Sequence, residues 1–452
     1  MPSRREFIAA IGGVGTMLTA GQGAARTPTT DPPTTAWTRT YPASSGFDAI
    51  HPVNDGYVLV GSRATENQGY RGFITKTTAT GHPKWQQVVG DSATVLNACA
   101  SRPDGGVIVA GTTNIREPSP VRDRNLSSDP LIVALDADGH VRWSRTLQPR
   151  AGDGSSNAIA RIPDGYLVGG HRRQNEDSTI RPWIAQISDD GHRRWARTIG
   201  WQGQDGVISD VSTSDEAWYV GGSTAPAESS AGWQETAFIT RLDLDASTQW
   251  QYTLDGRKGS SIAALETDGD GVVAVGNRRF SADDDGTGVH LRVTSDGTTG
   301  WRHSYSTGPW NWLHGMAADD DGYLLVGTRE QSSGGTSDNG PRGAWVLNTG
   351  PSGELRWETT YFDGEYSAGD AIHPLGGDRF LVGGRTHTDD GDVGWLLNAG
   401  GAQLETGSSA SETVSDLMEH VPPDTDAVAL GTVLGAGAVT MGRRLLSEKR
   451  SD

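Results

Sequence analysis

Short apolar runs that end in glycine recur along the chain at a regular spacing. Each run is five residues long, and an Asp-Gly or similar turn precedes most of them, as at Asp55-Gly56 and Asp321-Gly322. The runs are Tyr57–Gly61, Val107–Gly111, Tyr166–Gly170, Trp218–Gly222, Val272–Gly276, Tyr323–Gly327 and Phe380–Gly384. Their length, their flanking turns and the lack of a 3.6-residue period predict buried β-strands and no helices in this region.

Two further apolar segments accompany each run. The first comes after a polar loop of variable length: Phe73-Ile74, Leu131–Leu135, Trp183–Ile187, Phe238–Leu242, Leu291–Val293, Trp345–Leu347 and Trp395–Leu397. The second contains a tryptophan: Trp37, Trp85, Trp143, Trp195, Trp250, Trp301 and Trp357. Successive tryptophans are 48 to 58 residues apart. Four short β-segments in a period of this length are typical of one blade of a β-propeller.

The order of the segments indicates how such a propeller closes. Trp37 comes before any other repeat segment, and the last repeat ends near Asn398 without a tryptophan segment of its own. We therefore predict an all-β, seven-bladed propeller of four-stranded blades over residues 35–405, in which Trp37–Tyr41 completes the last blade and removes its open edge. The alternative is that residues 402–405 take that place, which would leave an eight-bladed or open array.

Ala134–Trp143 (ALDADGHVRW) is the clearest copy of the repeat. It resembles the tryptophan-containing repeats of PQQ-like and WD40-like β-propellers, in particular those of secreted repeat proteins, and the resemblance covers roughly residues 35–405. It implies the fold, but propellers carry many functions. Within this resemblance, one alternative function is a quinoprotein-like oxidoreductase that uses PQQ with Ca²⁺. The adjacent cysteine pair of many such enzymes is absent, since Cys99 is the only cysteine.

Composition adds a second line of information. The chain has 452 residues, 62 glycines, 15 tryptophans and a formal charge of −18. The recurring turns explain the glycines. Only four of the 38 basic residues are lysine, and 40 of the 56 acidic residues are aspartate. Such a surface resembles that of proteins from salt-in halophiles, in which concentrated salt screens self-repulsion. The negative charge argues against a nucleic-acid partner.

The N-terminus carries the pattern of an export signal. Ser3-Arg4-Arg5-Glu6-Phe7 precedes an apolar, glycine-rich stretch, and Gly23-Ala24-Ala25 resembles a cleavage site. Residues 1–25 therefore look like a twin-arginine signal peptide, which would be handled by the twin-arginine translocase and would place the protein outside the cell.

The C-terminal region contains a second segment that indicates where the protein is located. Residues 406–426 lose the repeat and are interpreted as a linker. Ala427–Gly442 contains no charged residue, and Arg443-Arg444 follows it. Sixteen helical residues span about 24 Å, somewhat less than the roughly 30 Å hydrocarbon core. Extending the helix to residues 427–446 narrows the gap. We expect a membrane anchor here, with a buried helix docked on the propeller as the alternative.

Candidate binding residues come from aligning the blades. About nine residues before each glycine-ending run, most blades have a polar residue: Asp48, Asn97, Asn157, Ser209, His314 and Asp370, with Ser260 as an approximate seventh. The first strand of a blade lines the central channel, so these residues predict a polar ring that binds a polar ligand or a hard cation. His51 and His373 follow the two aspartates in identical Asp-Ala-Ile-His-Pro segments. The alternative is that the ring residues only hydrogen-bond local backbone.

The sequence contains no GxSxG, HExxH or Walker-type motif. We therefore expect an exported, membrane-tethered binding or scaffold module without catalytic activity. A protein, a glycan or a small molecule could each be the partner. The oxidoreductase remains the alternative.

Overall fold

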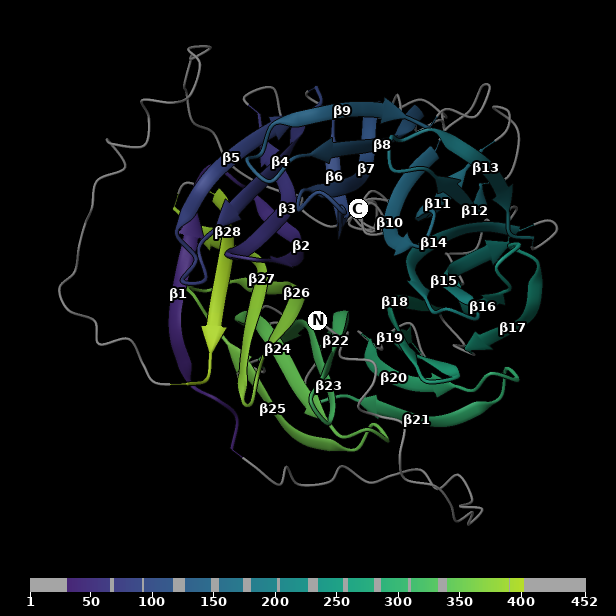
Figure 1. Ribbon diagram of the computed structural model, residues 1–452. Coiled ribbons are helices and arrows are strands. Elements are labelled where there is room, and N and C mark those ends of the chain that lie inside the picture. The colour runs from purple at the N-terminus through teal and green to yellow at the C-terminus, as the bar shows by residue number, and fades with distance from the viewer. Residues whose placement is uncertain are drawn as a thin grey trace, which may run out of the picture.

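Seven four-stranded antiparallel sheets surround a central axis in the computed structural model of this protein (Figure 1). The structure describes residues 31–65, 69–91, 93–116, 127–147, 154–173, 180–200, 204–226, 235–254, 259–279, 286–307, 310–331, 340–389 and 391–401. This arrangement is a seven-bladed β-propeller and confirms the fold that the repeats predict.

The first three blades follow the chain in simple order. Blade 1 contains β2 (Gly46–Val53), β3 (Gly56–Ala64), β4 (Tyr70–Thr77) and β5 (Pro83–Val89). Blade 2 contains β6 (Val95–Ser101), β7 (Val107–Arg116), β8 (Ser127–Leu135) and β9 (Val141–Thr146). Blade 3 contains β10 (Gly154–Ile162), β11 (Gly165–Arg172), β12 (Arg181–Ile187) and β13 (Arg193–Thr198).

The next three blades repeat this pattern. Blade 4 contains β14 (Gln204–Thr213), β15 (Trp218–Pro226), β16 (Thr236–Leu242) and β17 (Thr248–Leu254). Blade 5 contains β18 (Gly259–Asp268), β19 (Gly271–Arg279), β20 (Thr287–Val293) and β21 (Thr299–Tyr305). Blade 6 contains β22 (Asn311–Asp319), β23 (Gly322–Glu330), β24 (Arg342–Thr349) and β25 (Leu355–Tyr361).

Blade 7 is assembled from both ends of the repeat region. It contains β26 (Ser367–Gly376), β27 (Arg379–Thr388) and β28 (Gly391–Ala399), and its fourth strand is β1 (Thr35–Tyr41). Trp37 pairs with Asn398 and Tyr41 with Gly394. The prediction that Trp37–Tyr41 closes the last blade is therefore confirmed. Residues 402–405, the competing segment, lie outside the described residues.

The antiparallel order gives the propeller two different faces. The turns between the first and second strands and between the third and fourth strands lie on one face, which we call the turn face. The longer second-to-third-strand loops and the connections between blades lie on the other. The first strands lie nearest the axis in Figure 1, and each contacts the first strand of both neighbouring blades. The hydrophobic core lies between the blades, where the apolar runs of adjacent sheets pack together.

The repeated tryptophans join successive blades. Trp85 of blade 1 packs on Gly139, in the β8–β9 turn of blade 2, and its Nε1 donates to the Ala137 backbone oxygen at 3.2 Å. Trp250 packs in the same way on Gly297 and donates to the Ser295 oxygen at 2.7 Å. Each of these two rings therefore packs on a turn residue of the next blade that has no side chain.

Gly139→Ala tests this contact. The φ of Gly139 is +88°, and a Cβ there would lie 2.6 Å from the Trp85 ring. We expect the substitution to lower the free energy of unfolding by about 2 kcal/mol or more, through left-handed strain and overpacking. The matched control is Ala246→Gly, because Ala246 holds the equivalent position in blade 4 at a φ of 60°. Urea titration of both variants checks the prediction, which fails if Gly139→Ala is as stable as the wild type.

The segments for which the sequence predicts a signal peptide, a linker and a membrane anchor are not among the described residues. Residues 1–25, 406–426 and 427–446 all lie outside the described residues. Within the described part of the chain, no helix has the length and apolar character needed to cross a membrane.

Candidate ligand site at the axial ring

At one shared register, each first strand contains a bulged residue that has no register partner on the second strand; β26 has a second one, Leu375, nearer its end. The residues at the shared register are Asp48 in β2, Asn97 in β6, Asn157 in β10, Ser209 in β14, Ala263 in β18, His314 in β22 and Asp370 in β26. A bulge changes the direction of the side chain and bends its strand. Because the bulges share one register and the first strands surround the axis, the seven residues lie at one level; we call them the axial ring.

Six of the ring residues are those that the sequence alignment selects, and the seventh is different. Blade 5 contributes Ala263, whereas spacing suggested Ser260 as an approximate equivalent. The Ser260 hydroxyl instead donates to the Leu254 backbone oxygen at 2.7 Å and accepts from the Ala237 amide at 2.9 Å. The spacing is misleading because the position of the bulge, and not the distance to the next apolar run, defines the ring.

The neutral half of the ring connects neighbouring blades. Asn97 donates from Nδ2 to the Ser156 backbone oxygen at 3.0 Å, and Asn157 donates in the same way to Ile208 at 2.9 Å. Both acceptors directly precede the ring residue of the next blade. The Oδ1 atoms of the two asparagines and the Ser209 hydroxyl are buried without a hydrogen-bond partner among the described residues. Both asparagines thus bond to backbone of the neighbouring blade, and not to the local backbone that the alternative named.

The other half of the ring is charged and partly exposed. His314, Asp370 and Asp48 are consecutive ring members, from blades 6, 7 and 1. His314 Nδ1 lies 2.8 Å from Asp370 Oδ1, and their side chains are 29% and 15% exposed. Asp48 is half-buried, and its carboxylate has no hydrogen-bond partner in the described part of the chain. Solvent therefore reaches three adjacent titratable groups on this side of the ring.

A buried arginine sets the charge of these carboxyl groups. Arg385 of β27 is 7% exposed, and its positive charge acts on both aspartates. Burial alone would raise the pKa of Asp370, but Arg385 and then the His314 bond hold it below its usual value. Burial, and next the charge of Asp370, raise the pKa of Asp48 to about 7 despite Arg385. Asp370 is therefore ionised at neutral pH, whereas Asp48 exchanges its proton near pH 7.

Arg385 is the member of this group that sequence reasoning missed. It directly follows the glycine-ending run of blade 7. The corresponding residues of the other six blades are Ser62, Thr112, His171, Ser223, Asn277 and Thr328. The arginine differs from the smaller polar residues at this position in the other blades, and this difference can be seen in the sequence. Nothing in the sequence shows that its side chain reaches the axial ring.

His51 and His373 lie further along β2 and β26, toward the turn face. Burial, and then the neighbouring His373, lower the pKa of His51 to about 4, so this imidazole is neutral at pH 7. The His373 ring packs edge-on against Tyr57 at 5.9 Å between centroids. The described contacts of His51 include no ion pair with either aspartate. The paired Asp-Ala-Ile-His-Pro segments thus bring the two histidines near each other.

The chemistry of the ring can be compared with the cofactors that the sequence left open. A hard cation such as Ca²⁺ would need Asp48 and Asp370 as ligands, but Arg385 already supplies a positive charge to both. No ring position carries a Trp, Tyr or Phe on which a planar quinone could stack. The described ring residues therefore fit PQQ and Ca²⁺ poorly. They suit an uncharged ligand that both donates and accepts hydrogen bonds.

Comparison with known proteins adds a fold likeness only. No protein-family model matches this chain, and no curated protein matches it significantly in sequence. It is similar to the WD40 domain of Neurospora crassa Pan2, with 12% identity and a TM-score of 0.40 over 62% of this chain and 71% of that one. It is also similar to Sqt1 from Chaetomium thermophilum, with 12% identity and a TM-score of 0.42 over 78% and 82%. The fold itself places the protein among seven-bladed β-propellers.

Proposed function

We propose that this protein is an exported binding module in which the charged side of the axial ring, Asp48, His314 and Asp370, holds a hydroxyl-rich ligand such as a carbohydrate. The observation that carries the proposal is the unpartnered Asp48 carboxylate next to the His314–Asp370 pair. Hydroxyl groups can donate to the carboxylates, and charge-assisted hydrogen bonds of this kind are stronger than neutral ones. The absence of known catalytic motifs from the sequence supports binding over catalysis.

The proposed location rests on the two ends of the chain. The twin-arginine pattern at residues 1–25 supports export of the folded protein. The uncharged Ala427–Gly442 segment, followed by Arg443-Arg444, supports an anchor in the membrane whose basic end stays inside the cell. In this proposal the propeller presents its ring outside the cell on the linker of residues 406–426.

The test is a calorimetric titration with neutral mono- and disaccharides, with glycerol as a minimal polyol. Because Asp48 has a pKa of about 7, its charged form accumulates as pH rises. We expect affinity to increase between about pH 6 and pH 8. Asp48→Asn should weaken binding about tenfold at pH 8, since a neutral amide replaces a charge-assisted acceptor, and should remove the pH dependence.

Ser209→Ala is the matched control, because Ser209 occupies the same ring level in a neutral blade and its hydroxyl is buried. We expect this variant to bind as the wild type does. Equal affinity of the wild type and Asp48→Asn for every bound sugar would contradict the proposed site. Turnover of a sugar or alcohol that is lost in Asp48→Asn would instead show an enzyme.

A further inference from the structure

A cleft of about 370 Å³ opens on the turn face between blades 6 and 7, away from the axial ring. Asp319 and Asp321 line it from the β22–β23 turn, and Asp378 lines it from the β26–β27 turn. Arg356 is the basic residue of the lining, so three carboxylates face one guanidinium. Trp357 and Phe380 form an apolar wall, with ring centroids 5.9 Å apart. We call this space the seam cleft.

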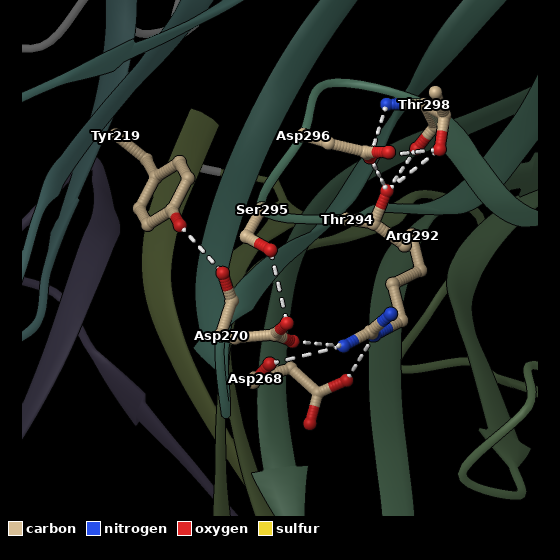
Figure 2. Close-up of polar contacts among 8 residues, drawn as sticks. All are labelled: Tyr219, Asp268, Asp270, Arg292, Thr294, Ser295, Asp296 and Thr298. Atoms are coloured by element: carbon tan, nitrogen blue, oxygen red, sulfur yellow. Dashed lines mark hydrogen bonds and ion pairs between the residues drawn. The ribbon is translucent and has the colours of Figure 1, made fainter.

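Blade 5 shows what fills the equivalent space elsewhere. Figure 2 shows Arg292 of β20 reaching both aspartates of the β18–β19 turn. Its Nε lies 2.6 Å from Asp268 Oδ2, and one terminal nitrogen lies 3.1 Å from Asp270 Oδ1. The Ser295 hydroxyl donates to Asp270 Oδ2 at 3.0 Å, and Tyr219 of blade 4 donates to the Asp270 backbone oxygen at 3.1 Å (Figure 2). A cation from the blade itself thus satisfies both carboxylates.

Blade 6 has the same two aspartates but not the arginine. Asp268 of blade 5 and Asp319 of blade 6 hold equivalent positions. Each pairs with a glycine across the turn between the first and second strands: Asp268 with Gly271, and Asp319 with Gly322. On the third strand, Arg292 of blade 5 corresponds to Asn348 of blade 6. Each pairs with the tryptophan of the fourth strand, Arg292 with Trp301 and Asn348 with Trp357. A side chain of two carbons therefore replaces a long cation in an otherwise equivalent position.

Asn348 is the observation that indicates a ligand. It is 8% exposed and lines the seam cleft, yet its amide has no hydrogen-bond partner among the described residues. Asp319 likewise has no ion pair there. Arg356 reaches only Asp321, with Nη1 2.5 Å from Oδ1, because it approaches from β25 and not from β24. A largely buried amide without a hydrogen-bond partner and a carboxylate without an ion pair therefore line the same space.

The closure of the ring changes the surroundings of Trp357. In blades 2 and 6, a third-to-fourth-strand turn covers the tryptophan of the preceding blade, as Gly139 covers Trp85 and Gly353 covers Trp301. Blade 7 has no such turn, because its third strand is β28 and its fourth strand is β1 from the other end of the repeats. The residues before β1 take its place instead, because Tyr361 donates to the Pro33 backbone oxygen at 2.6 Å as Tyr305 donates to that of Gly353. Trp357 is 6% exposed and forms a wall of the seam cleft.

We propose that the seam cleft binds the guanidinium or ammonium group of an aliphatic cation, in the position that the Arg292 guanidinium fills in blade 5. Asp319 supplies the charge, the Asn348 amide oxygen accepts a second hydrogen bond, and Trp357 with Phe380 packs on the aliphatic chain. The cation can belong to a small amine or to an arginine side chain of a protein partner. This site is independent of the axial ring.

Calorimetric titration of the full-length protein with agmatine tests the proposal, with 1-pentanol as an uncharged probe. We expect agmatine to bind with one-to-one stoichiometry and pentanol not to bind at the same concentrations. Asn348→Arg should fill the cleft and weaken agmatine at least about tenfold, as a covalent substitute for the ligand. Asp319→Asn keeps the shape of the side chain and should also weaken agmatine, which separates loss of charge from misfolding.

The control variant is Asp104→Asn. It removes a carboxylate from the corresponding turn of blade 2, where Arg102 pairs with Asp104 at 2.8 Å, and should bind agmatine as the wild type does. An acetylated and amidated Gly-Arg-Gly peptide distinguishes the two possible origins of the cation, a small amine and an arginine side chain of a protein. Binding of the peptide supports a protein partner, and binding of agmatine alone supports a small amine. The proposal is overturned if neither cation binds, or if Asn348→Arg binds agmatine as tightly as the wild type.

Discussion

Replacing His290 with leucine should restore about 3 kcal/mol of the stability that the protein loses between about pH 6.5 and pH 4. His290 of β20 has no exposed surface, and neither ring nitrogen has a hydrogen-bond partner among the described residues. Its imidazole packs between Trp301 and Tyr323, with centroids 4.6 and 5.3 Å away. Burial, and then the charge of His303, lower the pKa of His290 from 6.5 to about 3.

The sign of the pH effect follows from this shift. Between the two pKa values the unfolded chain binds a proton at His290 and the folded protein does not, so stability falls as the solution is acidified. Leucine has no proton to bind and should remove this part of the slope. His51 and His171, whose pKa values are also lowered to about 4, leave the variant with some acid sensitivity.

Urea titrations at several pH values measure the effect. His192→Gln is the control, because His192 is 68% exposed and should show the acid profile of the wild type. The prediction is contradicted if His290→Leu loses as much stability on acidification as the wild type does. That result would show that the folded protein binds a proton at His290 as readily as the unfolded chain.

Replacing Tyr41 with alanine should detach the closing strand. Tyr41 is 3% exposed, packs edge-on against Phe47 at 5.1 Å and donates from its hydroxyl to the Gly81 backbone oxygen of blade 1 at 2.6 Å. Truncating a buried aromatic side chain costs about 3–5 kcal/mol. Because β1 is not connected by a turn to the rest of blade 7, this loss weakens the attachment of the whole strand. We expect faster hydrogen exchange in β1 and in β28.

Tyr305→Ala is a close control for this prediction. Tyr305 ends the fourth strand of blade 5, is 7% exposed and donates to the Gly353 backbone oxygen of blade 6 at 2.7 Å. Its strand β21 is joined to β20 by a short turn, so a similar loss of contacts should not release it. Mass-spectrometric hydrogen exchange compares β28 in one variant with β20 in the other. Equal protection of the two strands would show that the closing strand needs no special contact.

The features that the sequence predicts best are those that recur in each of the seven blades. The glycine-ending runs, the tryptophan spacing and the unmatched Trp37 segment predicted the blades and their closure, and the structure confirms each. Six of the axial ring residues were also found, since bulges recur at nearly constant spacing. Those features depend on local patterns that a single strand or turn records.

The missed features depend on contacts between blades. Arg385 acts on Asp370 in its own blade and on Asp48 in blade 1, and no local pattern connects these positions. Ala263 replaced the expected Ser260 because a bulge is set by pairing and not by counting. The seam cleft required both the register that aligns Asn348 with Arg292 and the packing of the first turns of blades 6 and 7 side by side. Neither can be read from one segment alone.

The pairing of β1 with β28 within blade 7 also constrains how the protein can fold. Thr35 pairs with Ala399, so β1, the first of the described strands to be synthesised, finds its partner only after β28, the last of them, has been made. The entropy of closing so long a loop grows only with the logarithm of its length, but such distant pairing slows folding. Six blades can form while β28 still presents an unpaired edge. The time between their formation and the docking of β1 is therefore the period in which the chain is most exposed to aggregation.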